Sequence, residues 1–221
     1  LTIEYMCSKQ PEAIFVCVPT PTDDTNYKTL TDVLDAIFAT DYKGIVVVKS
    51  TVLPDYLAPY DVVYNPEFLS RATANEDFAN QEYMILSGKN TSFWRDVFII
   101  SLKKLDPFRI FTCTLTEAAM IKYTTNCFLS LKVSFFNQLY DICNKNNTSY
   151  NVVRSILSHD SRIGNTHTQV PGPDGNQGFG GTCFPKDTEA FIHYAKSLGT
   201  SISILETAVE YNKKVRKTLD L

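Results

Sequence analysis

The 221-residue sequence has little of what marks membrane, nucleic-acid-binding or secreted proteins. It has no apolar run long enough to cross a bilayer, and a formal net charge of −3 argues against a polybasic surface for nucleic acid or anionic lipid. Its six cysteines form no Cys-x-x-Cys pair, which argues against a zinc site or a disulfide framework. We therefore expect reduced thiols in a cytosolic protein with no metal, membrane or nucleic-acid partner.

Short apolar runs alternate with helical patterns in the first half of the chain. Strands are predicted at residues 13–18, 44–49, 61–64 and 82–86, and helices at residues 27–38 and 92–105. Buried strands between helices predict a parallel α/β sheet. We place a boundary at residues 111/112, which gives an α/β domain at 1–111 and a helical domain at 112–221.

The second half predicts mostly helix. A long helix is predicted at residues 116–144, and its apolar face is formed by Ile121, Phe128, Phe135, Leu139 and Ile142. A shorter helix is predicted at residues 151–158, a Gly- and Pro-rich loop follows at 164–181, and two more helices are predicted from 185 and from 201. A polar loop of that length suggests a function.

A glycine-rich turn near the C-terminus delivers a single cysteine to the predicted start of a helix. Residues 178–187 read Gly-Phe-Gly-Gly-Thr-Cys-Phe-Pro-Lys-Asp. Pro185 suits the first turn, and Asp187 adds a carboxylate there. Cys183 would then lie at the positive end of the helix, where thiol pKa values fall. The pattern suggests a thiolate nucleophile with a carboxylate one turn away, and a small buried side chain is the plain alternative.

This string resembles the catalytic cysteine signature of the UDP-glucose/GDP-mannose dehydrogenase family. Four more segments are similar to blocks of that family, in family order: residues 15–21 (Phe-Val-Cys-Val-Pro-Thr-Pro), 48–52 (Val-Lys-Ser-Thr-Val), 65–69 (Asn-Pro-Glu-Phe-Leu) and 117–126 (Glu-Ala-Ala-Met-Ile-Lys-Tyr-Thr-Thr-Asn). The blocks are most similar to those of members that oxidise UDP-glucose. The insertion at 170–175 is similar to short viral or phage-like forms, which would act in the host cytoplasm. The resemblance implies a partial Rossmann-like NAD-binding domain followed by an all-helical dimerisation domain.

The resemblance also implies a four-electron oxidation that converts UDP-glucose to UDP-glucuronate with two NAD molecules. Cys183 would attack the C6 aldehyde to give a thiohemiacetal, and a second oxidation would leave a thioester that water hydrolyses. Lys122 and Asn126 would stabilise the oxyanions, while Asp187 would pair with Lys122 and help deprotonate water. Without the resemblance, Lys122 and Asn126 indicate only a solvated helix face.

Other positions match family residues around the cofactor and the sugar nucleotide. Thr51 and Glu67 would hold water near the reacting carbon, and the resemblance implies NAD contacts from Thr20, Pro21, Thr51 and Glu67. Substrate contacts would come from Glu67, Phe68, Leu69, Lys122, Asn126, Arg162, Phe179 and Gly180. Arg162 would reach the phosphates of a neighbouring subunit, although a surface arginine is equally consistent with the sequence. Residues 201–221 would form a homodimer.

The chain departs from the family pattern in two places. It has no Gly-x-Gly-x-x-Gly turn for the cofactor pyrophosphate, so the resemblance implies that the first βαβ segment is missing. Arg71 stands where the family has a glutamate. Three alternatives therefore remain: a GDP-mannose dehydrogenase, a UDP-N-acetylmannosamine dehydrogenase, or a catalytically silent module for dimerisation or sugar-nucleotide binding.

Overall fold

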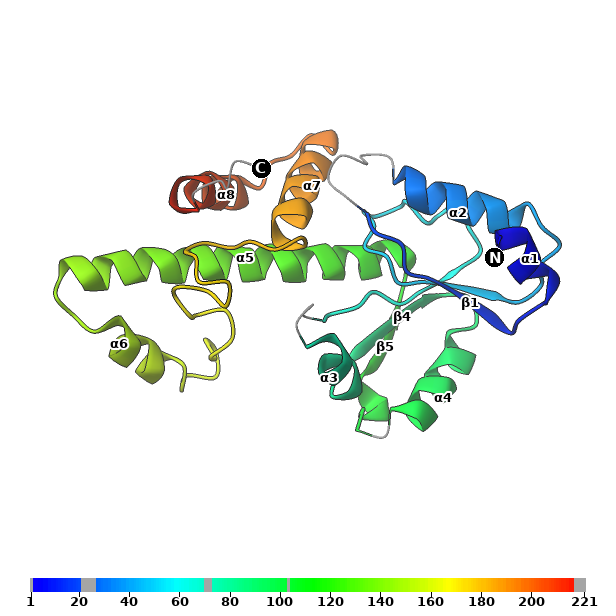
Figure 1. The fold of residues 1–221 in the computed structure, drawn as a ribbon, viewed down its shortest axis with the longest axis horizontal. Helices are drawn as coiled ribbons and strands as arrows, with labels where there is room; N and C mark the ends of the chain where they lie inside the picture. The colour runs from blue at the N-terminus through cyan, green and yellow to red at the C-terminus, as the bar shows by residue number, and fades with distance from the viewer. Residues whose placement is uncertain (1, 21–26, 70–72, 103, 217–221) are drawn as a thin grey trace. The chain divides into compact units, whose positions relative to one another are not determined.

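The computed structural model describes residues 2–20, 27–69, 73–102 and 104–216. It divides into two compact units, Leu1–Lys122 and Tyr123–Leu221, and the division falls within helix α5 (Leu115–Lys145). The boundary expected at residues 111/112 lies N-terminal to this division and stays a prediction. Each unit has its own architecture, and Figure 1 shows the strands and helices of both.

The first unit is built on a five-stranded sheet in the order β1-β2-β3-β4-β5. The strands are β1 (Ala13–Val16), β2 (Ile45–Val48), β3 (Val63–Tyr64), β4 (Met84–Gly88) and β5 (Ile110–Cys113). Three neighbouring pairs are parallel, and only β3 and β4 are antiparallel. The α/β prediction is therefore confirmed as a mostly parallel sheet. The sequence did not predict β5, because only Ile110 of its four residues is buried.

The antiparallel pair depends on one close approach between main chains. Val63 pairs with Gly88 and Tyr64 with Ser87, so the chain comes back beside β3 in the opposite direction. Gly88 has a φ of +94°, and a Cβ there would overlap the Val62 carbonyl oxygen. Glycine is thus required at this position, and the apolar pattern of the strands alone could not reveal their direction.

Helices cover both faces of the sheet. One face packs against α2 (Lys28–Phe38), where Leu30 and Leu34 are fully buried with the strand residues Val46 and Val48. The other face packs against α4 (Thr91–Ser101) through Trp94 and Phe98. The unit is completed by α1 (Ile3–Ser8), α3 (Ala74–Ala79) and a short 3-10 turn at Pro107–Arg109.

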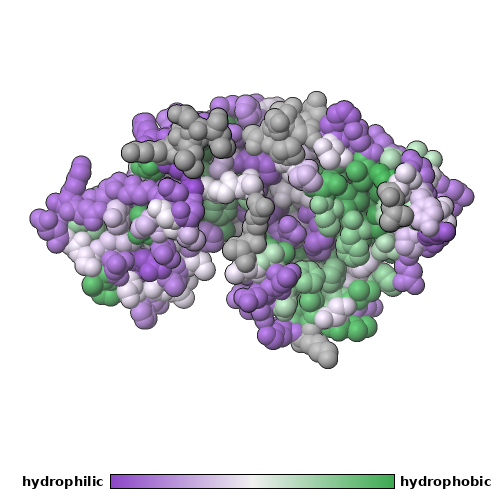
Figure 2. Space-filling model, in the orientation of Figure 1, coloured by the Kyte–Doolittle hydropathy of each residue, from purple (hydrophilic) through white to green (hydrophobic). Residues whose placement is uncertain are grey.

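Strand β1 lies at one edge of the described sheet. Its Phe15 is half exposed and packs edge-to-face on Trp94, with the ring centroids 5.2 Å apart. Figure 2 shows hydrophobic residues gathered over the first unit, where Figure 1 draws the sheet and its helices. The helices of this unit therefore leave part of its apolar surface open.

The second unit is helical, as the sequence predicts. After α5 come α6 (Tyr150–Leu157), α7 (Phe184–Ser197) and α8 (Ser203–Val215). The long segment between α6 and α7 is irregular but well bonded: the Tyr150 hydroxyl donates to the Thr168 carbonyl at 2.5 Å, and the Arg154 Nε donates to the Thr168 hydroxyl at 2.9 Å. Among the described residues, no helix is both long and apolar enough to cross a bilayer.

The predicted apolar face of α5 lies mostly at the surface. Phe128, Phe135 and Ile142 are each 62% exposed, and Ile121 is 39% exposed. The buried side of the helix carries small and polar residues, such as Ser130 and Ser134, each of which donates to the main-chain oxygen four residues earlier. Periodicity identified the apolar stripe correctly, but it could not tell which side of the helix the rest of the unit covers.

Candidate active site

Cys183 is exposed at the start of α7. It is the N-cap residue of this 14-residue helix, which begins at Phe184, and Pro185 occupies the first turn, where its missing N–H leaves no hydrogen bond unmade. Gly181 precedes it with a φ of +74°, a conformation that favours glycine. The turn therefore presents an accessible thiol at a helix N-terminus, the geometry that the sequence predicted.

Asp187 lies one turn into α7 and is almost completely buried. Its main-chain N donates to the Cys183 carbonyl at 2.8 Å, so the two residues are linked by the helix itself. Its carboxylate accepts from the Asn126 side-chain amide at 2.5 Å and pairs with Lys186. The sequence did not single out Lys186, because a neighbour in the chain gives no periodic signal. Within this unit, Asp187 is thus held by one amide from α5 and one cation from α7.

Another thiol near Asp187, that of Cys127 on α5, is unsuited to be the nucleophile. Cys127 is buried, and its Sγ lies 3.9 Å from the main-chain oxygen of Asp187. Burial raises the pKa of the Cys127 thiol to about 12, and the negative charge of Asp187 adds to the effect. Cys183 is therefore the accessible thiol beside this carboxylate.

Lys122 is the last residue of the first unit, and its side chain contacts the segment that follows β3. Its Nζ donates to the Glu67 main-chain oxygen at 2.6 Å and lies 5.2 Å from the centre of the Phe68 ring. Lys122 is buried, the Glu67 side chain is exposed, and Phe68 and Leu69 are half-buried. The structure thus brings three of the predicted residues together, Lys122, Glu67 and Phe68, but through a main-chain oxygen of Glu67 instead of its carboxylate.

A second lysine, which the sequence prediction missed, lies in the same region. The Lys49 Nζ donates to the Asn65 side-chain oxygen at 2.9 Å and to its main-chain oxygen at 3.3 Å. Burial lowers the pKa of Lys49, and the charge of Lys122 lowers it further, while Glu67 and Cys17 raise it. Lys49 belongs to the block at 48–52, which was the available signal.

The carboxyl ends of β1 and β2 carry two of the residues that were expected to bind NAD, Thr20 and Thr51. Thr20 is buried and Thr51 half-buried in the segments that follow these parallel strands, and ligands of open α/β sheets bind at such strand ends. The two glycines of the first unit are structural: a Cβ at Gly44 would overlap the Pro11 carbonyl oxygen, and Gly88 joins β4 to β3. Neither forms a phosphate turn. Pro21 and Arg71 lie outside the described residues.

The remaining predicted residues lie in the second unit. Arg162 is exposed and forms an ion pair with Asp160 at 2.6 Å. Phe179 is buried, with its ring edge-to-face to Phe184, and Gly180 is half-buried. His167 packs against the Phe184 ring at 5.7 Å, and burial lowers its pKa. Among the described residues, no group of three or more His, Cys, Asp and Glu could hold a metal ion.

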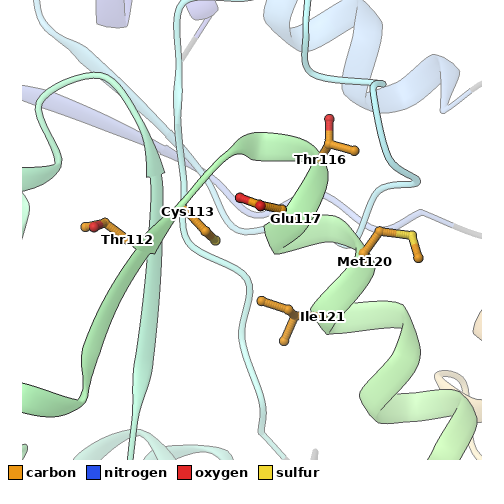
Figure 3. Close-up of a pocket in the computed structure, with 6 residues that line it drawn as sticks. All are labelled: Thr112, Cys113, Thr116, Glu117, Met120 and Ile121. Atoms are coloured by element: carbon orange, nitrogen blue, oxygen red, sulfur yellow. The ribbon is translucent and has the colours of Figure 1, made fainter.

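An open pocket of about 500 Å³ lies at the turn from β5 into α5. Figure 3 shows its lining, which consists of Thr112, Cys113, Thr116, Glu117, Met120 and Ile121. The Glu117 carboxylate accepts from the main-chain N and the hydroxyl of Thr114, both at 2.8 Å, and these bonds lower its pKa. Glu117 therefore caps the helix, and none of the predicted catalytic residues lines this pocket.

Comparisons with known proteins agree with these observations. The chain matches two models of the UDP-glucose/GDP-mannose dehydrogenase family, for the NAD binding domain at residues 2–98 and for the central domain at residues 116–214. It is 36% identical over 157 residues to the UDP-glucose 6-dehydrogenase TuaD of Bacillus subtilis (strain 168), an alignment that covers 71% of this chain and 32% of that protein. It is 29% identical over 248 residues to the UDP-glucose 6-dehydrogenase AglM of Haloferax volcanii, with 100% of this chain and 56% of that protein covered.

Solved structures are similar as well. A UDP-glucose dehydrogenase from the hyperthermophilic archaeon Pyrobaculum islandicum has a TM-score of 0.77 and 28% identity, covering 96% of this chain and 52% of that one. A UDP-D-ManNAc dehydrogenase from Pyrococcus horikoshii has a TM-score of 0.76 at 18% identity, covering 92% and 50%, and this likeness concerns the fold alone. The chain spans between 32% and 56% of the length of these relatives.

Proposed function

Because this chain belongs to the UDP-glucose/GDP-mannose dehydrogenase family, we propose that it acts in the NAD-dependent oxidation of UDP-glucose to UDP-glucuronate. One observation carries the proposal: an exposed thiol, Cys183, begins α7, and Asp187 lies one turn later, buried against Asn126. A thiol can form the covalent adduct with an aldehyde, and a carboxylate and an amide near it can act as a base and as a hydrogen-bond donor.

Each residue has a role in this chemistry. The Cys183 thiolate adds to the C6 aldehyde carbon, which forms a C–S bond and places negative charge on the former carbonyl oxygen. The ammonium of Lys122 and the side-chain amide N–H of Asn126 stabilise that charge. Asp187 takes a proton from the water that later cleaves the thioester and frees the thiol. Bound NAD would accept a hydride from C6 in each of the two oxidations.

The binding roles follow the elements that carry the residues. NAD would contact Thr20, Pro21, Thr51 and Glu67, which come after strands of the first unit in the sequence. The sugar nucleotide would contact Glu67, Phe68, Leu69, Lys122, Asn126, Arg162, Phe179 and Gly180. A guanidinium such as that of Arg162 suits a phosphate because it can donate two parallel hydrogen bonds.

The test is NADH formation, measured at 340 nm, by the purified chain with NAD and UDP-glucose. Cys183→Ala should abolish it, whereas Cys113→Ala, which removes a half-buried thiol of β5 outside the proposed site, should not. Parallel assays with GDP-mannose and UDP-N-acetylmannosamine identify the sugar. If the folded chain makes no NADH with any of the three, the silent-module alternative replaces this proposal.

We also propose that the chain forms a homodimer. The sequence prediction put the contact on the C-terminal helix, where Ile204 of α8 is exposed while Leu205 and Val209 are buried within the second unit. The apolar stripe of α5 offers more surface. Ile121, Phe128, Phe135 and Ile142 are each seven residues apart, so an antiparallel copy of the helix would set isoleucine against isoleucine and phenylalanine against phenylalanine.

Light scattering after gel filtration tests this proposal. We expect a dimer that Phe128→Lys converts to a monomer, because a charge would be buried at the centre of the interface. Phe108→Lys is the matched control, since Phe108 is also an exposed phenylalanine but belongs to the 3-10 turn Pro107–Arg109 instead of the stripe on α5. A dimer that survives Phe128→Lys and is broken by Ile204→Lys would return the contact to α8.

A further inference from the structure

The loop before Cys183 is held by an asparagine to which the mechanism above assigns no role. Asn212 is buried in the last turn of α8, and its side-chain amide makes two hydrogen bonds to one loop residue. Its Oδ1 accepts from the main-chain N of Phe179 at 2.7 Å, and its Nδ2 donates to the main-chain O of Phe179 at 2.9 Å. The primary amides of Asn and Gln carry a donor and an acceptor side by side, so Asn212 fastens both polar groups of Phe179 at once.

A second asparagine holds the preceding residue. The main-chain N of Gly178 donates to the Asn137 side-chain oxygen at 2.9 Å, and Asn137 is itself fixed by donation to the Val133 carbonyl at 2.8 Å. Gly178 has a φ of +75°, and a Cβ there would overlap the Asn212 Oδ1. Glycine at this position thus lets the Asn212 amide reach the main chain.

Phe179 transmits this constraint toward the thiol. Its buried ring packs edge-to-face with Phe184 at a centroid distance of 6.4 Å, and Phe184 directly follows Cys183 as the first residue of α7. Three residues, Gly180, Gly181 and Thr182, separate Phe179 from Cys183 in the chain. The anchored residues on either side of the cysteine therefore decide where this turn places it.

We propose that Asn212 is a positioning residue that fixes the Cys183 thiol at the N-terminus of α7. The inference rests on the proposed function only in taking Cys183 as the reacting group. It assigns Phe179 a structural part in the site, because both its main-chain polar groups are engaged by Asn212. Without these two hydrogen bonds, the turn samples conformations that move Cys183 away from the N-terminus of α7, the end of a helix that favours negative charge.

The test measures the thiol directly and needs neither NAD nor a sugar nucleotide. The purified full chain is treated with limiting iodoacetamide, and peptide mass spectrometry gives the labelling rate of Cys183 relative to Cys17, an exposed thiol of the first unit. We expect Asn212→Ala to lower this ratio at least threefold. Asn151→Ala, which changes an exposed asparagine of α6, should leave the ratio unchanged.

A second variant covers the case in which Asn212→Ala does not fold. Asn212→Asp has nearly the same size and keeps the acceptor for the Phe179 N–H, but it lacks the donor to the Phe179 carbonyl; we expect a ratio between those of the parent and the alanine variant. If NADH forms in the activity assay, kcat should fall in both variants by a larger factor than KM for the sugar nucleotide rises.

Either variant can overturn the proposal. A labelling ratio within 1.5-fold of the parent in a folded Asn212 variant (roughly the reproducibility of such rates) would show that the thiol does not depend on this amide. A lowered ratio in a chain that makes no NADH would keep the positioning role and reject the proposed activity. The two proposals therefore fail separately.

Discussion

The buried ion pair of α7 allows a quantitative test of how the candidate site is held together. The Asp187 side chain is 1% exposed and that of Lys186 is 16% exposed. Lys186→Met would leave the carboxylate its hydrogen bond from Asn126 and remove the charge beside it. Breaking a buried pair by removing one partner costs about 3–5 kcal/mol, and the partial exposure of Lys186 places our expectation at about 2–4 kcal/mol of unfolding free energy.

Removing the charge of the other partner should lower the free energy of unfolding by less. After Asp187→Asn, the long Lys186 side chain can carry its ammonium to solvent, so we expect a loss of about 1–2 kcal/mol. The double variant should be more stable than the sum of the single losses predicts, with a coupling energy of about 1–3 kcal/mol. Urea unfolding followed by circular dichroism gives the free energy of unfolding of the parent, the two single variants and the double variant.

The exposed pair Lys28–Asp32 on α2 serves as the control cycle. Its side chains are 75% and 61% exposed, so its coupling should stay within about 0–0.5 kcal/mol. An Asp187–Lys186 coupling as small as that of the control would refute the reasoning, because it would mean that burial adds nothing to this pair.

Two further predictions concern thiol accessibility and main-chain packing. In the native protein at pH 9, iodoacetamide should label Cys17 and Cys183 but not Cys127, since a pKa of about 12 leaves roughly a thousandth of that thiol ionised; rapid Cys127 labelling in the mass spectrum would contradict its burial. Gly88→Ala should cost about 2–4 kcal/mol in urea unfolding, because it adds a main-chain overlap to the strain of a positive φ. Gly175→Ala, with a φ of +77° and open space around it, should cost about 1 kcal/mol, and equal losses at both sites would exclude the overlap.

Local features of the chain could be predicted because their causes are local. Valine-rich runs form β2, and Pro185 with Asp187 in the first turn marks the start of α7. Cys183 lies at that helix start because the glycine turn and the proline leave few alternatives. The resemblance to a known family then supplied roles that composition and spacing alone could not assign.

The direction of β4 and the open face of α5 required the tertiary structure. Apolar periodicity reports which side of an element is hydrophobic, but it carries no information on what covers that side. For this reason the stripe through Phe128 and Phe135 could be read from the sequence, while its exposure could not. The antiparallel pairing likewise depends on a contact of Gly88 with a distant segment.

The sequence by itself determined that the chain alternates strands and helices before a helical half, and that a single thiol begins a helix. Only the tertiary structure decided which groups meet that helix. Asn212 and Phe179 are 33 residues apart, and Asn126 and Asp187 are 61 apart, yet each pair is joined by a buried hydrogen bond. Such bonds form when the chain packs, because a buried polar group must find a partner wherever the fold supplies one.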